Sequence, residues 1–413
     1  MPKAATLADI KNELKSIIRS NSDRGFLPYG GYNNVCHAML RMLDDSKASE
    51  DRNEAFNIRL YLLIEMVKLF SHADASSGLH SQVIDDCLGG IDEFCKAVSA
   101  EESKKALQSI LKAAKNKAFG EWEEYGYRLL RSTVHLVQDS KQAEAVYELF
   151  RILGPMYGGK EYPDRYLITQ GIIERLEGAA AAEKYRMEHL HVPEIRKLVV
   201  EEAIEAGQYE LAEKLSREAL AQVIRHWEPS AWAYDLERIY ALTGEKDKQI
   251  EIVQLILTKG DRSYYSKLKA LFQAEGTWEQ QREPILQKLS EAYMSHSFAA
   301  LLSEENETGR LLNVVEKSPI LIEHYGMQLA REYPAETYRI FEAYILNEAA
   351  EATDRRKYKG VCKLIRAYDQ AGAKAEARGM IQRLIEKYPR RVAMVDELQT
   401  LDKKLMRQLP VSD

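Results

Sequence analysis

The sequence predicts an all-α protein, an irregular α-solenoid of stacked helical hairpins of the tetratricopeptide-like type. Glycine and proline are scarce, at 22 and 11 of 413 residues, and no proline occurs between Pro28 and Pro155. Apolar residues recur at spacings of three and four, which indicates helix, whereas the alternating pattern of strands is rare. Glycines separate the apolar stretches, where turns between helices are expected.

The individual helices follow from this pattern. Leu7, Ile10, Leu14, Ile17 and Ile18 form one apolar stripe and predict the first helix. The stretch from Ile58 to Phe70 is apolar on more than one face, so we expect a central helix that is packed from two sides. We expect about twenty helices in all, arranged over 1–155, 156–315 and 316–413 as parts of one array.

Glycines are expected at the turns between these helices, in the left-handed conformation that often ends a helix. The positions read in this way are Gly30 and Gly31, Gly78, Gly89 and Gly90, Gly158 and Gly159, Gly207, Gly244, Gly260, Gly276, and Gly372. Three of these turns predict helical hairpins, because an apolar helix precedes the glycine and a helix rich in small residues follows it. The hairpins cover Ala203 to Leu215, Ile239 to Val253, and Ile365 to Ile381.

Charge is distributed unevenly along the chain. The formal net charge is −6, which excludes a uniformly basic protein that coats nucleic acid. The segment from Arg355 to Arg407 nevertheless carries fifteen Lys and Arg against six Asp and Glu, a net charge of +9. A local basic patch is therefore predicted near the C-terminus.

The four cysteines, Cys36, Cys87, Cys95 and Cys362, form no CxxC motif. This usage is typical of buried thiols in a reducing compartment. The first residues lack the apolar core of a signal peptide, and no uncharged stretch reaches the 18 residues of a membrane span. We expect a cytoplasmic protein without a membrane partner.

Several stretches carry a resemblance to a known family: RGFLPYGGYNNVCHAML (24–40), HLHVPEIRKLVVEEAIEAGQYELA (189–212), YYSKLKALF (264–272), RRKYKGVCKLI (355–365) and KYPRRVAMVDEL (387–398). Together they resemble the helical region that follows the zinc finger in bacterial SWIM zinc-finger proteins. The finger itself needs Cys-x-Cys followed by Cys-x-His, and this chain has neither, so zinc binding is not carried over. The resemblance implies a helical scaffold that is separate from its recognition module.

No motif predicts a catalytic, cofactor or metal site. Gly154 to Lys160 has the G-x4-G-K spacing of a phosphate loop, but Glu161 stands where a hydroxyl must hold magnesium, and the preceding residues predict helix. We interpret this segment as a loop between helices. His189 and His191 have no Cys or carboxylate at ligand spacing, and Cys87 and Cys95 are interpreted as core residues.

Aromatic and basic residues supply the candidate binding surface. The chain has 23 tyrosines against nine phenylalanines, and tyrosine suits wet interfaces. The residues that we predict to contact a partner are Arg355, Arg356, Tyr358, Lys359, Arg390 and Arg391, together with Tyr264 and Tyr265. Arginine binds carboxylate or phosphate in a bidentate manner. As exposed charges add little to stability, we expect replacement of the four arginines to leave the thermal midpoint nearly unchanged.

The function that these features favour is a non-enzymatic scaffold, which binds a protein or peptide partner through a concave groove without a cofactor. The alternative is a nucleic-acid-associated accessory protein that uses the basic C-terminal region, and strong salt dependence of binding would indicate it.

Overall fold

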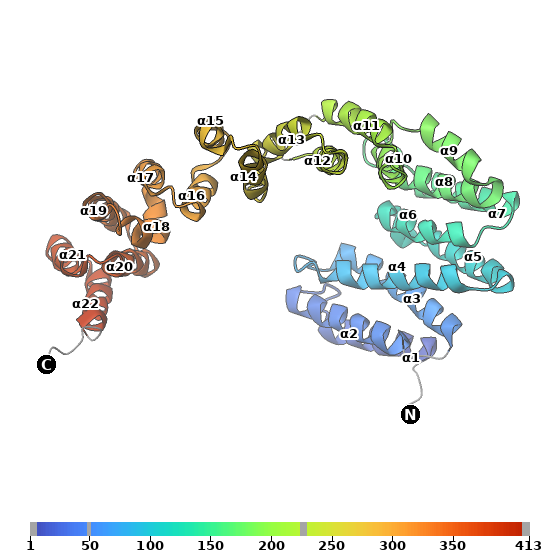
Figure 1. Cartoon of the computed structure of the whole chain (residues 1–413). Helices are drawn as coiled ribbons and strands as arrows, with labels where there is room; N and C mark the ends of the chain where they lie inside the picture. Colours follow the sequence, from blue (N-terminus) through green and yellow to red (C-terminus); the bar gives the residue numbers. More distant parts are fainter. Residues whose placement is uncertain (1–5, 48–50, 224–228, 407–413) are drawn as a thin grey trace. The chain divides into compact units, whose positions relative to one another are not determined.

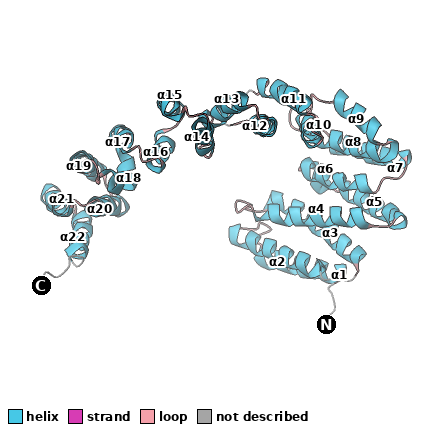
Figure 2. Cartoon of the chain, in the orientation of Figure 1, coloured by secondary structure: helices cyan, strands magenta, loops and turns pink. Residues whose placement is uncertain are grey.

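The computed structural model describes residues 6–47, 51–223 and 229–406. Over these residues the chain consists of α-helices and short 3-10 turns joined by loops, with no strand longer than an isolated bridge (Figure 2). The predicted all-α fold is confirmed. The chain forms two compact units, Met1–Leu215 and Ser216–Asp413.

The first unit is a stack of helices in which each helix packs on the next one or two along the chain (Figure 1). Its helices are α1 (Leu7–Asn21), α2 (Tyr29–Lys47), α3 (Arg52–Leu69), α4 (Leu79–Ala97), α5 (Ala100–Ala114), α6 (Glu123–Arg131), α7 (Ser140–Leu153), α8 (Pro163–Glu177), α9 (Ala179–Glu188), α10 (Pro193–Glu205) and the start of α11 (Tyr209–Ala221), with 3-10 turns at Phe70–His72, Lys117–Gly120 and Ser132–His135. One apolar core extends from Ile10 to Ile172. As predicted, α3 is the central helix, because its buried side chains lie against α2 and α4.

The second unit repeats this arrangement. After the end of α11 it contains α12 (Ala231–Thr243), α13 (Lys246–Thr258), α14 (Tyr264–Ala274), α15 (Trp278–Ala292), α16 (Ser295–Glu304), α17 (Thr308–Lys317), α18 (Ile322–Leu329), α19 (Pro334–Glu351), α20 (Arg355–Gln370), α21 (Lys374–Lys387) and α22 (Val392–Met406), with a 3-10 turn at Pro319–Leu321. Its core extends from Val253 to Leu405. Adjacent helices pack in pairs, as in α12 with α13 and α20 with α21, so the structure is a solenoid of stacked hairpins.

The expected boundaries after residues 155 and 315 are not those of the structure. Packing of α8 on α6 and α7 joins the segments on either side of residue 155 into one unit. The core of the second unit likewise continues across residue 315 through α17 and α18. The boundary between units lies within α11, after Leu215.

Most of the predicted glycine turns are confirmed by positive φ angles. Gly207 has φ +71° and ends α10 in a Schellman motif, in which its N–H donates to Ile204 O (3.1 Å) and the Gln208 N–H donates to Ala203 O (2.8 Å). Gly244 and Gly372 end α12 and α20 in the same left-handed region, with φ +74° and +103°. The three predicted hairpins are therefore joined as expected.

Two glycine pairs do not form turns. Gly30 and Gly31 lie in the first turn of α2, and Gly89 and Gly90 lie inside α4. Close approach explains one member of each pair. A Cβ on Gly31 would stand 2.4 Å from Asn21 O, and a Cβ on Gly90 would stand 2.1 Å from Arg59 Nε. These positions need glycine for space and not for a left-handed backbone.

Candidate functional site

The predicted basic residues lie in the first turns of α20 and in the turn between α21 and α22. Arg355 begins α20, and its guanidinium bonds to Asp396 and Glu397 of α22, both at 2.7 Å. Its side chain remains 59% exposed. The Arg355 charge is thus already matched by two carboxylates, and it links α20 to α22.

Arg391 bonds to the backbone of a neighbouring helix and is not part of an open binding surface. Its guanidinium donates to the carbonyl oxygens of Ala349 (2.7 Å), Ala350 (3.2 Å) and Ala352 (3.0 Å) at the C-terminal end of α19. It also lies over the Tyr388 ring, 4.2 Å from the ring centroid. Because helix-end carbonyls lack partners within their own helix, this cation satisfies them and complements the helix dipole. The structure therefore reverses the expectation that Arg391 can be replaced without loss of stability.

Three predicted cations remain open to solvent. Arg356 and Lys359 lie on the exposed face of α20, and Arg390 lies in the turn before α22. They form no ion pair with the residues that the structure describes. The contact of Arg391 with the end of α19 brings this turn beside the start of α20, so the structure does place these cations in one neighbourhood.

Two predicted aromatic contacts, Tyr358 and Tyr265, are buried, which corrects the expectation that their rings contact a partner. Tyr358 is 7% exposed and belongs to the core between the C-terminal helices, because it lies on the face of α20 opposite to the solvated one. Tyr265 is 4% exposed and packs edge-on against Trp278 at 5.9 Å between centroids. Neither ring is open to a partner in this conformation.

Tyr264 is half-buried and takes part in a polar aromatic surface. Its ring lies 5.6 Å from that of Tyr234, whose hydroxyl donates to Asp261 Oδ2 at 2.8 Å. Burial and the neighbouring Asp261 raise the pKa of Tyr234 to about 12. Both tyrosines are therefore neutral hydrogen-bonding groups at physiological pH.

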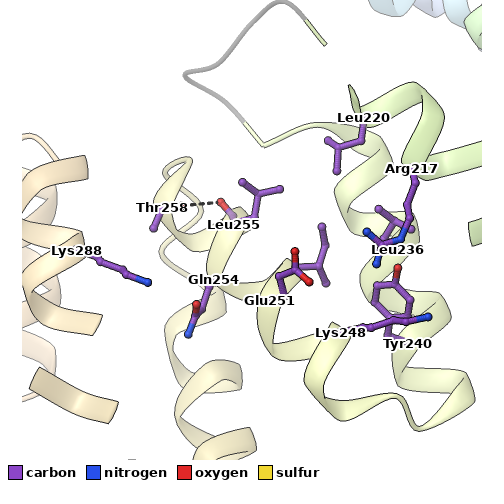
Figure 3. A pocket seen from close by; sticks show the side chains of 11 residues that line it. Arg217, Leu220, Leu236, Tyr240, Lys248, Glu251, Gln254, Leu255, Thr258 and Lys288 are labelled. Atoms are coloured by element: carbon purple, nitrogen blue, oxygen red, sulfur yellow. Dashed lines mark hydrogen bonds between the residues drawn. The ribbon is translucent and has the colours of Figure 1, made fainter. Parts of the chain in front are cut away.

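The sequence did not predict a pocket in the second unit. A pocket of about 400 Å³ opens between the end of α11, α12, α13 and α15 (Figure 3). Its apolar side chains come from successive turns of these helices, and its polar ones from their solvent edges. The lining residues are Arg217, Leu220, Leu236, Tyr240, Lys248, Glu251, Ile252, Gln254, Leu255, Thr258 and Lys288.

Three cations line this pocket, and one of them, Lys248, is paired with Glu245 at 2.6 Å. Arg217 and Lys248 both approach the ring of the buried Tyr240, at 5.5 Å and 5.3 Å from its centroid. Lys288 reaches towards the pocket from α15 at the opposite end (Figure 3). Among the described residues, Glu251 is the one carboxylate that lines the pocket.

The floor of the pocket is aliphatic. Leu236 and Ile252 are buried, while Leu220 and Leu255 are half-buried and keep apolar surface open. The hydroxyl of Thr258 donates to Leu255 O at 3.0 Å, within its own helix. Only the apolar spacing of α12 and α13 was readable in the sequence. The pocket cations were not, because which lysines converge depends on how α15 packs on α13.

The other motifs lie where the sequence placed them. Gly154 to Lys160 joins α7 to α8 as a loop, and the Met156 N–H donates to Lys160 O at 2.7 Å. Cys87 and Cys95 are buried free thiols, which confirms the core interpretation. The His189 and His191 rings lie 5.8 Å apart, and His189 Nδ1 is 2.7 Å from Tyr185 O.

Within the described residues, no three His, Cys, Asp or Glu side chains gather as metal ligands would. Nor does any helix among them combine the length and apolarity that a membrane crossing requires.

Comparison with known proteins shows no family. No protein-family model matches the chain, and no curated protein matches it. Among solved structures, the crystal structure of the P58(IPK) TPR domain is 12% identical, with 97% of this chain and 98% of that chain covered, at a TM-score of 0.22. A circular tandem repeat protein with a novel repeat topology is 14% identical, with 98% of each chain covered, at a TM-score of 0.25. At these TM-scores the likeness carries no argument about function.

Proposed function

We propose that this chain is a non-enzymatic helical-repeat scaffold that binds an acidic peptide segment of a protein partner. The observation that carries the proposal is the pocket of the second unit, with an aliphatic floor and cations from three helices. A peptide that places one apolar side chain between carboxylates matches both features. The pocket, and not the concave groove expected of a stacked array, is the proposed contact.

Charge complementarity supports an acidic occupant. Arg217, Lys248 and Lys288 face the same space as the single carboxylate of Glu251. Arg217 and Lys248 also lie against the Tyr240 ring, which positions their charges at one end of the pocket. Lys248 is already paired with Glu245 at 2.6 Å. Lys288 forms no ion pair with the described residues, so it is the cation that a peptide carboxylate would pair with.

The size and lining support a side-chain pocket for a peptide. A volume of about 400 Å³ admits one or two side chains, and sites for small ligands occupy a similar range. The hydroxyls at the pocket belong to Tyr240 and Thr258, and the latter is bonded to its own helix. The proposal therefore assigns binding and not chemistry to this site.

The resemblance to the helical region of SWIM zinc-finger proteins stays a prediction. If it holds, the scaffold acts together with a recognition module that is encoded separately.

A peptide-display selection on the full chain tests the proposal. We expect enriched peptides to contain an apolar residue flanked by Asp or Glu. Lys288→Glu should weaken a selected peptide by about tenfold, because it places like charges together. Lys246→Glu is the matched control: it makes the same charge change at an exposed site of α13 outside the pocket lining, and should leave affinity nearly unchanged.

Two results would contradict the proposal. One is enrichment of peptides without acidic residues, and the other is equal weakening by Lys288→Glu and Lys246→Glu, which would indicate diffuse attraction only. Steep salt dependence together with capture of nucleic acid would favour the alternative function instead, through the open cations Arg356, Lys359 and Arg390.

A further inference from the structure

A buried arginine in the first unit points to a second, independent site. Arg59 lies in the middle of α3, in the apolar stretch that forms the centre of this unit, and is only 8% exposed. Its side chain runs across to α4 and lies on the backbone of Gly90, where any Cβ would meet Arg59 Nε at 2.1 Å. The absence of a side chain at Gly90 of α4 leaves the room that this guanidinium occupies.

Arg59 has no counter-ion among the residues that the structure describes. Its Nε is buried without a hydrogen-bond partner, and the guanidinium forms no ion pair with them. Cys87 lies nearby on α4, but burial raises the pKa of this thiol, so it stays protonated and supplies no negative charge. Buried arginines are normally paired, since an unpaired buried charge is costly.

The space beside Arg59 is a small positively charged pocket. It has a volume of about 170 Å³ and is lined by Ser46, Lys47, Arg52, Ala55, Arg59, Gly90, Glu93 and Phe94. Arg52, Ala55 and Arg59 follow one another at helical spacing, so one face of α3 turns towards the pocket. Among the described residues, three cations thus line it against one carboxylate, that of Glu93, which is exposed and not paired with Arg59.

The neighbouring cations are held in place. Lys47 pairs with Asp44 at 3.0 Å on α2, and the Arg52 guanidinium lies 6.0 Å from the centroid of the Phe94 ring. Phe94 in turn stacks on Phe56 at 4.4 Å. The pocket is therefore a formed feature of the packing between α2, α3 and α4.

We infer that this pocket binds the phosphate group of a small phosphorylated molecule, with Arg59 as the buried ligand. A pocket of about 170 Å³ corresponds to roughly six water volumes, which is room for one tetrahedral oxyanion. Because Lys47 is already paired with Asp44, Arg52 and Arg59 are the two cations that the anion would meet. The planar fork of arginine binds two oxygens at once, so one phosphate would provide the partner that Arg59 lacks. This inference does not depend on the proposed peptide binding in the second unit.

Thermal unfolding of the full chain in inorganic phosphate, against chloride at equal ionic strength, tests the inference. We expect phosphate to raise the midpoint of the wild-type chain in a saturable way, as any ligand of the folded state does. Arg59→Met keeps the length of the side chain and removes the charge, so it should weaken phosphate binding by about 10- to 100-fold. In chloride the same variant should be as stable as the wild type or more stable, because a buried unpaired charge is gone.

Arg186→Met is the matched control. Arg186 is also a buried arginine of the first unit, but it pairs with Glu202 at 3.2 Å. Its replacement should lower the midpoint in both salts and leave the phosphate-dependent rise intact. Acetate in place of phosphate should give a smaller rise in the wild type.

Three results would overturn the inference: no phosphate-dependent rise in the wild type, an equal rise in Arg59→Met, or loss of stability or folding in Arg59→Met in chloride. The last would show that Arg59 has a structural partner. A rise with acetate as large as that with phosphate would also reject a phosphate site.

Discussion

Gly90→Ala tests the packing between α3 and α4 on which the buried arginine depends. In an ordinary helix interior this change stabilises by about 1 kcal/mol, because alanine restricts the unfolded chain and favours helix. Here the new Cβ would stand 2.1 Å from Nε, 2.6 Å from Cδ and 2.9 Å from Cζ of Arg59. The guanidinium must therefore move, and overpacking of this kind costs about 1 to 3 kcal/mol. We expect the helix gain to be cancelled or reversed.

Gly89 provides the internal control, since it precedes Gly90 in the same helix and a Cβ there would meet nothing within 4 Å. Gly89→Ala should therefore keep the gain of about 1 kcal/mol. In an Arg59→Ala background the obstruction is absent, and Gly90→Ala should stabilise as much as Gly89→Ala does. The double-mutant cycle of Arg59 and Gly90 should then give a coupling of about 1 to 3 kcal/mol, and the cycle of Arg59 and Gly89 a coupling near zero.

Thermal unfolding followed by far-ultraviolet circular dichroism measures these differences. In a unit of this size, 1 kcal/mol shifts the midpoint by about 2 to 4 °C, so the gap between the two glycine variants is measurable. If Gly90→Ala stabilises the Arg59-containing chain as much as Gly89→Ala does, the guanidinium does not occupy that space. That result would refute the packing argument.

The remaining predictions concern stability. Arg391→Ala should destabilise by about 1 to 3 kcal/mol, because it leaves the carbonyls at the end of α19 without their donor; Arg390→Ala, at an exposed site, should stay within about 0.5 kcal/mol of the wild type in urea unfolding. Tyr265→Phe should be neutral or stabilising, because its buried hydroxyl has no hydrogen-bond partner in the part of the chain that the structure describes. Tyr127→Phe should cost about 1 kcal/mol, since that hydroxyl bonds to the carbonyls of Phe150 and Gly154. Calorimetry measures the difference in stability between the two tyrosine variants. Gly207→Val should lower the midpoint by forcing a β-branched residue to φ +71°, at a cost of about 1 to 2 kcal/mol, and an unchanged midpoint would show that the turn can relax.

The fold was largely predictable because it is determined by local patterns. Helical spacing of apolar residues places most helices, and glycine turns such as Gly207 and Gly372 end them where the sequence indicates. The unit boundary within α11 was not predictable, because it depends on which non-neighbouring helices share a core. No local change of composition marks that position.

The candidate site was much less predictable, because the role of a side chain is decided by partners that are distant in sequence. Arg391 bonds to carbonyls about forty residues earlier, and nothing around it distinguishes it from the exposed Arg390. Tyr358 stands among four cations in the sequence, yet helical geometry turns it into the core while Arg356 and Lys359 face solvent. Composition indicated the basic region correctly. It could not show which cations bond to other parts of the protein and which are exposed to solvent.

Gly90 and Arg59 show how two unusual residues become informative when they are read together. The sequence alone predicts a turn at Gly90 and assigns no role to Arg59. A glycine inside a helix is destabilising unless something needs the space, and a buried arginine is destabilising unless something neutralises it. The contact between them explains the glycine and leaves the arginine charge without a protein partner among the described residues. The first cost is thus offset within the fold by room for the guanidinium, whereas the second is the cost that the anion proposed for the adjoining pocket would offset.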